Sequence, residues 1–177
     1  MTMKKFLKVD EWNIIEEGFH ADNLRASESI FSLGNGRFGQ RGNFEESYSS
    51  DSLQGSYVAG ITFLDRTRVG WWKNGYPRFF SRIPNTPDWS GIYVRLIDEE
   101  LDLAHWDVES YERRLDMKAG ISYRDFRVTS PKGNTLEVHV EHINSMDNQN
   151  LCLIKYSVTS VNYEGKISLV PYLNGDV

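Results

Sequence analysis

The amino-acid sequence predicts an all-β protein that folds as an antiparallel sandwich with little helix. Three observations predict this fold class. Short runs alternate between apolar and polar residues, clusters of turn residues separate these runs, and no long segment shows a helical period. Many short strands joined by frequent turns are typical of antiparallel sandwiches. A chain of 177 residues is long enough for such a sandwich to bury a sizeable core.

The alternation is strictest in the second half of the chain. From residue 135 to residue 141 every second residue is apolar, so one face of this strand is expected to be buried. Residues 131–134 (Pro-Lys-Gly-Asn) form a predicted hairpin turn that joins it to the preceding strand, over residues 121–129. The same patterns predict further strands over residues 12–16, 30–33, 38–41, 57–64, 92–97, 108–115, 152–158 and 167–169.

Charge and hydropathy exclude two classes of partner. The net charge is -5 and the Lys and Arg residues are dispersed among acids, so no surface for nucleic acid is expected. The longest apolar runs, such as residues 151–154, cover only a few residues and are too short to cross a membrane. The N-terminus has no apolar stretch behind its lysines, so no secretory signal is predicted and a cytoplasmic location is expected. The single cysteine, Cys152, is interpreted as a small buried hydrophobe.

A glycine-rich stretch over residues 32–43 superficially resembles a phosphate-binding loop. It lacks the Gly-Lys-Ser/Thr ending of such loops, and no helical pattern follows it. We therefore interpret Asn35-Gly36 as a hairpin turn that needs a positive φ. Gly39 and Gly42 then mark a bulge or a close approach of the backbone.

A second stretch, residues 67–80, combines paired tryptophans with polar residues on a segment broken by Gly and Pro. Aromatic rings stack on the C–H face of a sugar, and amide and cationic donors reach its hydroxyls. The same rings would also serve to pack the loop against another domain or against the sandwich itself. The candidate residues for substrate binding or for an interface are Arg68, Trp71, Trp72, Lys73, Asn74 and Tyr76.

The sequence pattern predicts neither a catalytic centre nor a metal site. Carboxylates occur as neighbouring pairs at 16–17, 45–46 and 99–100, but adjacent strand residues point to opposite faces. We expect these acids to be solvated, with residues 98–100 in a turn. The four histidines lack the spacing of metal ligands. A Ser-His-Asp triad stays open because its members need not be neighbours, although no Gly-x-Ser-x-Gly elbow is present.

The chain shows no internal repeat and no linker, so residues 1–177 are interpreted as a single domain. It ends directly after an apolar strand, without a polar tail or a closing element. This pattern favours a segment of a longer protein.

Several stretches together resemble glycoside hydrolase family 65. Residues 28–36 (Glu-Ser-Ile-Phe-Ser-Leu-Gly-Asn-Gly), with residues 12–15 and 41–46, are similar to the opening of that family's enzymes. Residues 67–77 (Thr-Arg-Val-Gly-Trp-Trp-Lys-Asn-Gly-Tyr-Pro) and residues 51–55 resemble its maltose phosphorylase branch in particular. The resemblance continues downstream and covers essentially the whole chain. It implies a galactose-mutarotase-like β-supersandwich as the N-terminal domain of a longer glycoside phosphorylase.

The resemblance also implies the reaction of the longer protein. Its enzymes cleave an α-1,4-linked disaccharide with inorganic phosphate and release glucose and β-glucose 1-phosphate with inversion. One Glu acts as general acid and phosphate attacks the opposite face, so no second carboxylate is needed. In the family both the acid and the phosphate site lie on a downstream (α/α)6 barrel. The resemblance therefore assigns no catalytic residue, metal or cofactor to these 177 residues, phosphate being a co-substrate, and this chain alone is expected to be inactive.

For this domain the resemblance implies a supporting role. We expect it to pack on the catalytic barrel of the same chain, to support a homodimer, and to let residues 67–77 border the entrance for maltose or a related disaccharide. One alternative is a stand-alone carbohydrate-binding or scaffold module. Another is the same family acting on trehalose, kojibiose or nigerose.

Overall fold

The computed structural model describes residues 6–67 and 73–176 and confirms the all-β prediction. Antiparallel strands dominate, and one α-helix and one short 3-10 turn, Ala21–Asn23, interrupt them. The elements are β1 Leu7–Val9, β2 Asn13–Glu17, α1 Leu24–Ile30, β3 Leu33–Gly34, β4 Phe38–Gln40, β5 Ser56–Val58, β6 Phe63–Arg66, β7 Phe79–Arg82, β8 Ile92–Arg95, β9 Asp107–Asp116, β10 Ile121–Thr129, β11 Thr135–Asn144, β12 Cys152–Ser160 and β13 Ser168–Pro171.

One layer is a six-stranded antiparallel sheet in the order β1-β2-β9-β10-β11-β12. Its long strands arise from the predicted alternation, and the predicted turn at 131–134 joins β10 to β11 with Gly133 at φ 85°. On one face of this sheet, Phe126 and Val138 stand opposite each other and are buried. Along both β10 and β11, buried residues alternate with residues that face the opposite side of the sheet, and the latter are mostly charged.

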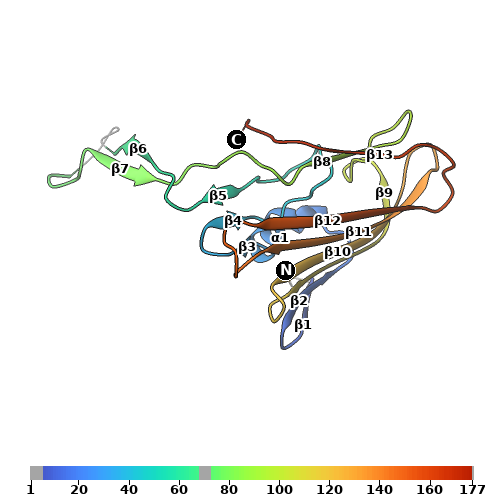
Figure 1. The fold of residues 1–177 in the computed structure, drawn as a ribbon, viewed down its shortest axis with the longest axis horizontal. Helices are drawn as coiled ribbons and strands as arrows, with labels where there is room; N and C mark the ends of the chain where they lie inside the picture. Colours follow the sequence, from blue (N-terminus) through green and yellow to red (C-terminus); the bar gives the residue numbers. More distant parts are fainter. Residues whose placement is uncertain (1–5, 68–72, 177) are drawn as a thin grey trace.

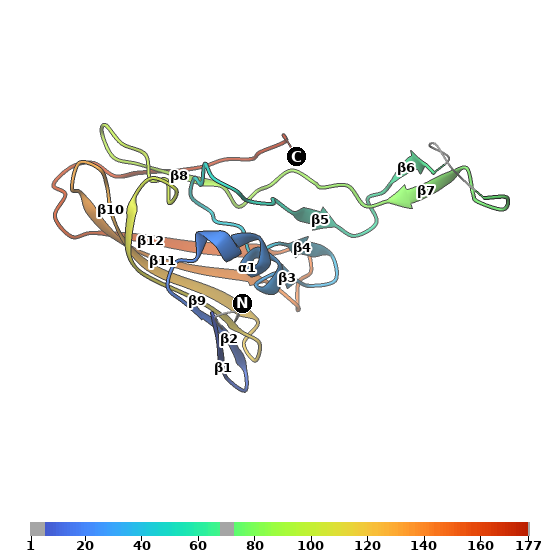
Figure 2. The same cartoon turned by 180° about the vertical axis from the view of Figure 1, so that it is seen from behind.

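The second layer is discontinuous and covers the buried face of the sheet (Figures 1 and 2). It contains the pair β8-β13, the small sheet β3-β4-β5 and helix α1. Leu101, Val128 and Leu136 are completely buried between the two layers. The other core residues are Leu24, Phe44, Val94, Leu96, Leu103, Trp106, Tyr111, Phe126, Val138 and Val140.

Two of the predicted strands are wrong. Residues 24–30 form helix α1, so the strand expected over 30–33 is reduced to Leu33–Gly34. The helix escapes a periodicity search because its buried face is largely polar, with Ser27 and Glu28 beside Leu24. The single strand expected over 57–64 is divided into β5 and β6, because Gly60 adopts φ 85° between them.

The glycine-rich stretch forms the predicted hairpin rather than a phosphate loop. β3 pairs with β4, and Gly36 at the turn has φ 85°. The two later glycines differ. A Cβ added at Gly42 would lie 2.9 Å from the Cβ and 3.0 Å from the carbonyl oxygen of Phe31, whereas one added at Gly39 would meet nothing within 4 Å. Close backbone approach therefore explains Gly42 alone.

This contrast gives a matched pair of substitutions. We expect Gly42→Ala to lower the free energy of unfolding by about 1–3 kcal/mol, because Phe31 backbone and Cβ atoms must move. Gly39→Ala should be neutral or slightly stabilising, since it meets no atom and restricts the unfolded chain. Denaturant or thermal unfolding of both variants measures the difference, and equal stability of the two would contradict the packing argument.

Candidate functional site

The described residues of the stretch predicted to bind sugar or to form an interface, Thr67 and 73–80, belong to a hairpin, β6-β7, that projects from the main body (Figures 1 and 2). Lys73, Asn74 and Tyr76 are exposed there, and the Tyr76 N–H donates to the Lys73 carbonyl oxygen at 3.2 Å across a turn. The other three candidates, Arg68, Trp71 and Trp72, lie outside the described residues. The structure thus brings the described candidates together on a projecting element and away from the core.

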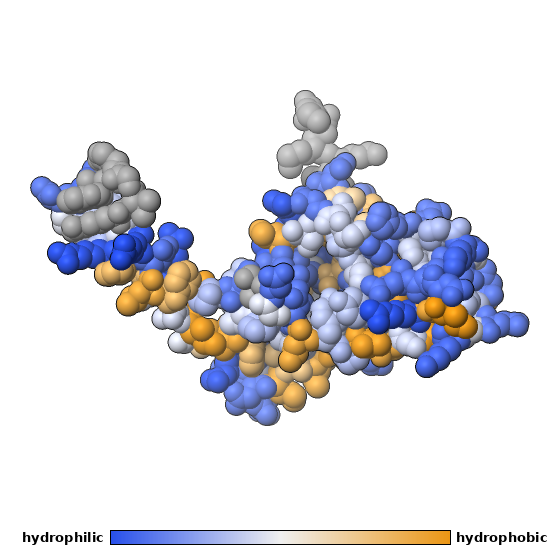
Figure 3. Space-filling view, turned by 90° about the horizontal axis from the view of Figure 1, so that it is seen from above, coloured by the Kyte–Doolittle hydropathy of each residue, from blue (hydrophilic) through white to orange (hydrophobic). Residues whose placement is uncertain are grey.

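The hairpin carries apolar side chains on both of its faces. From the register of β6 and β7, Phe63 and Phe80 share one face, and Leu64 and Phe79 share the other. All four are exposed, Leu64 to 70%, and Figure 3 shows apolar side chains along the arm between its tip and the main body. An isolated two-stranded hairpin is marginally stable in water. An arm of this composition therefore suits contact with another protein surface.

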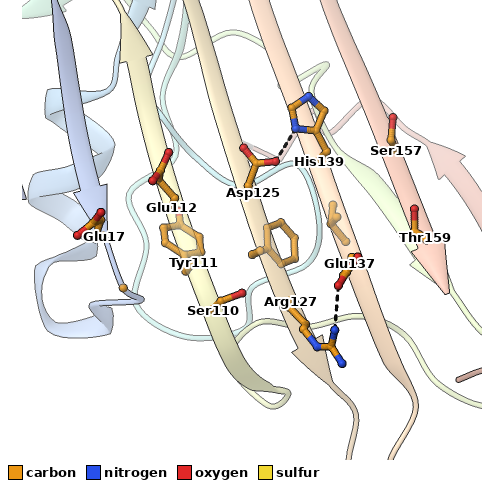
Figure 4. A pocket seen from close by; sticks show the side chains of 13 residues that line it. Glu17, Ser110, Tyr111, Glu112, Asp125, Arg127, Glu137, His139, Ser157 and Thr159 are labelled. Atoms are coloured by element: carbon orange, nitrogen blue, oxygen red, sulfur yellow. Dashed lines mark hydrogen bonds and ion pairs between the residues drawn. The ribbon is translucent and has the colours of Figure 1, made fainter. Parts of the chain in front are cut away.

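A second candidate site is a hollow of about 690 Å³ on the charged face of the six-stranded sheet (Figure 4). One row of side chains runs across five neighbouring strands, β2, β9, β10, β11 and β12. The residues of this row are Glu17, Glu112, Asp125, His139 and Ser157. A parallel row contains Ser110, Arg127, Glu137 and Thr159.

The first row contains Asp, His and Ser on adjacent strands, yet it is not a catalytic triad. His139 Nδ1 lies 2.6 Å from Asp125 Oδ1, as an orienting carboxylate would require. However, Nε2 faces Glu141 Oε1 at 3.1 Å, and among the described residues no hydrogen bond joins the ring to Ser157. Both ring nitrogens face carboxylates, so neither is directed at Ser157 to accept its proton.

The same geometry predicts how His139 titrates. The hydrogen bond to Asp125 and that to Glu141 outweigh desolvation and raise the pKa of His139 above its ordinary value. Its charged form thus stabilises the fold below the unfolded pKa, and this small contribution is lost as pH rises through the raised folded pKa. We expect NMR titration to show the raised pKa and Asp125→Asn to lower it. A pKa that does not respond to Asp125→Asn would contradict the hydrogen bond.

Three of the six paired carboxylates are buried, contrary to expectation, whereas Glu17 is exposed and Glu99 and Glu100 are half-buried. Glu16, Glu45 and Glu46 are each at least 96% buried, since their exposed fractions are 2%, 4% and 3%. Arg124 on β10 binds Glu46 through two nitrogens, each 2.6 Å from an oxygen, and Glu45 at 2.5 Å. The sequence did contain an indication of this burial. Arg124 is two residues from Phe126 in β10 and therefore faces the same buried side of the sheet, where a charged side chain needs buried counter-charges.

The environment of Glu45 determines its titration. Desolvation acts to raise the pKa of Glu45, but Arg124 and His142 together outweigh it, so that the pKa falls to about 2. The charged carboxylate therefore contributes stability above its unfolded pKa near 4.5, and this is lost as pH falls through 2. We expect the difference in free energy of unfolding between the native protein and Glu45→Gln to shrink as the pH falls from 4.5 to about 2. Acid unfolding followed by circular dichroism tests this, and a difference independent of pH would contradict it.

Three further features were considered in the part of the chain that the structure describes: a metal site, the cysteine thiol and a membrane-spanning helix. No group of three His, Cys, Asp or Glu side chains there could hold a metal ion. Cys152 is half-buried rather than fully buried, and desolvation raises the pKa of its thiol. The helices within residues 6–67 and 73–176 are too short and polar to span a bilayer.

Comparison with known proteins gives one consistent family. A model of the glycosyl hydrolase family 65 N-terminal domain matches residues 14–177. Maltose phosphorylase of Bacillus subtilis is 41% identical over 177 residues, which are 100% of this chain and 23% of that protein. The α,α-trehalose phosphorylase of Thermoanaerobacter brockii is 34% identical over 179 residues, which are 99% of this chain and 23% of that protein.

A solved structure shows the same fold. It is a human-microbiome protein assigned, on a provisional basis, as a kojibiose phosphorylase, with a TM-score of 0.79 and 29% identity. The match covers 88% of this chain and 20% of that one. The chain thus spans less than a quarter of the length of these relatives. Because the family model matches nearly all of its residues, the chain belongs to glycosyl hydrolase family 65, as the N-terminal domain of that family.

Proposed function

We propose that residues 1–177 form the N-terminal accessory domain of an inverting maltose phosphorylase. In this proposal the intact protein converts maltose and phosphate into glucose and β-glucose 1-phosphate on a downstream (α/α)6 barrel. The observation that carries the proposal is 41% identity to a maltose phosphorylase along the entire chain. Identity to trehalose and kojibiose phosphorylases is lower, at 34%, which favours maltose among the family's disaccharides.

The domain would act by supporting and bordering the catalytic barrel. The projecting hairpin supports this role, because its apolar faces lack cover from the rest of the described chain. Residues 67–77 at its tip would border the sugar entrance, with Lys73, Asn74 and Tyr76 among the groups that present polar atoms. Arg68, Trp71 and Trp72 would belong to the same border. The row of side chains on the charged face of the six-stranded sheet does not support a catalytic role, because the imidazole of His139 lies between two carboxylates.

Kinetics of the intact protein test the proposal. Phosphorolysis should be measured with maltose, trehalose, kojibiose and nigerose, and NMR should identify the anomer of the sugar phosphate. We expect the highest kcat/KM for maltose, release of the β anomer, and no activity from residues 1–177 alone. A higher value for another disaccharide would move the protein to that branch, and failure with all four would overturn the proposal.

Two further parts of the proposal have their own tests. Residues 1–177 should bind maltose weakly or not at all in calorimetry, whereas saturable binding would favour a stand-alone carbohydrate-binding module. The intact protein is proposed to be a cytoplasmic homodimer. Light scattering measures its mass in solution, and cell fractionation measures its location.

A further inference from the structure

A small polar cavity lies between the six-stranded sheet and the β3-β4 hairpin. Gln40 on β4 and His142 on β11 line it from the two sides. Arg41, Asn43 and Arg113 also line it, together with Glu45 of the buried ion network. This site is distinct from the hollow on the charged face, which involves the opposite side of the same sheet.

Two side chains at this cavity have unmet hydrogen-bonding capacity. Gln40 Oε1 and His142 Nε2 are both buried and have no hydrogen-bond partner among the described residues. The two residues are only 5% and 9% exposed. Leaving a buried polar atom unpaired is costly, so each such atom in a native protein calls for a partner. Both belong to residues that line the same cavity, which suggests one shared partner.

The size of the cavity decides what that partner is. The space open to the centre of a water molecule is about 20 Å³. A buried water molecule requires at least about 10–15 Å³ of such space and two to four polar contacts, so about one water molecule fits here. A phosphate ion or a sugar is several times larger than one water and does not fit.

The hydrogen-bond donors and acceptors around the cavity also match those of a water molecule. His142 Nδ1 lies 3.5 Å from Glu45 Oε1, which favours the tautomer that has its hydrogen on Nδ1, directed at this carboxylate. Nε2 is then an acceptor, as is Gln40 Oε1. Water has two hydrogens to donate, and the lining Arg41 and Arg113 guanidinium groups contain N–H groups able to donate to its oxygen. The rings of Trp89 and His142 pack edge to face with their centroids 5.5 Å apart, and this contact limits reorientation of the His142 ring.

We propose that one structural water molecule is bound in this cavity and joins β4 to β11 by donating hydrogen bonds to Gln40 Oε1 and His142 Nε2. It would connect the small β3-β4 sheet to the ion network of Glu45 and Arg124 in the main sheet. The ligand is therefore solvent held as part of the fold, and it does not depend on which disaccharide the intact protein uses.

A high-resolution crystal structure of the intact protein tests this directly. We expect one water peak within about 3.2 Å of both Gln40 Oε1 and His142 Nε2. A direct hydrogen bond between Gln40 and His142, an empty cavity, or a different bound species would overturn the proposal. Neutron diffraction would further show both water deuterium atoms pointing at these two acceptors, and a deuterium on Nε2 would contradict the assigned tautomer.

A substitution provides a second measurement. Gln40→Met is close in shape but removes the acceptor, so the water peak should be lost and the unfolding temperature should fall. Gln54→Met is a matched control on the same small layer, because Gln54 bonds Asp88 and does not line the cavity. Its structure should retain the water. If the water persists unchanged in Gln40→Met, then Gln40 is not its partner and the proposed bridge is wrong.

Discussion

Replacing Arg124 with methionine is expected to prevent stable folding of the intact protein or to lower its unfolding temperature sharply. The Arg124 side chain is 5% exposed and forms ion pairs with both Glu45 and Glu46, which are buried with it. Removing one partner of a buried charge network leaves the remaining charges uncompensated, which costs about 3–5 kcal/mol. Tyr156 donates to Glu46 Oε2 at 3.1 Å, but one neutral donor cannot replace a cation. Soluble yield and thermal unfolding measure the effect.

Arg127→Met is the matched control for this substitution. Arg127 lies on the same strand, also binds two glutamates, Glu109 and Glu137, and differs in facing solvent with 38% exposure. Exposed ion pairs contribute roughly 0–1 kcal/mol, so this variant should be almost as stable as the native protein. Equal losses in both variants would show that burial of the network is not what makes Arg124 important.

A triple variant makes the test sharper. Combining Arg124→Met with Glu45→Gln and Glu46→Gln removes the uncompensated charges along with the cation. We expect it to recover a large part of the lost stability, because neutral residues in a buried ion network are often tolerated. If the triple variant is no more stable than Arg124→Met alone, the loss arises from packing around the Arg124 stem rather than from charge.

Replacing Phe63 and Phe80 together with serine should impair the intact protein more than substitution of other exposed apolar residues. Both rings lie on one face of the projecting hairpin and are exposed to 48%. If another domain covers this face, as proposed, the variant should unfold at a lower temperature. It should also lose roughly tenfold or more in kcat/KM, because small displacements of a bordering loop disturb substrate positioning.

Met146→Ser is the control for the hairpin variant. Met146 is 73% exposed and lies between β11 and β12, outside the hairpin sequence. This variant should retain native kinetics and stability. Native behaviour of the double serine variant as well would show that the hairpin face is free in the intact protein, and the proposed packing on the barrel would be abandoned.

The predictions that succeeded depended on local patterns. The alternation over residues 135–141 predicted β11, and Gly133 and Gly36 marked turns whose positive φ the structure contains. Such patterns are readable because side chains alternate strictly along a strand and because glycine adopts positive φ without strain. Helix α1 was missed because Ser27 and Glu28 on its inner face are polar and are satisfied by partners elsewhere, Ser27 by Glu16 at 2.9 Å.

The candidate site was predicted only in part. Residues 67–77 were recognised as unusual from their aromatic and polar content, and their described members are exposed as an interface would require. That they lie at the end of a projecting arm was not predictable, because the register of β6 and β7 and the direction of the arm depend on the strands around them. The open triad hypothesis also needed coordinates. The position of Glu141 beside His139 excludes the row of Asp125, His139 and Ser157. At His105, Ser49 and Asp102 both face Nε2 of the ring, so the carboxylate does not orient it through Nδ1.

The sequence by itself determined the fold class, the turn positions and the family to which the chain belongs, because each is encoded in neighbouring residues. The tertiary structure alone decided which charges are buried and what neutralises them. Arg124 and Glu46 are 78 residues apart in the chain, and their pairing follows from the packing of two layers rather than from any local pattern. The same packing encloses the cavity beside His142, where unpaired buried atoms call for water.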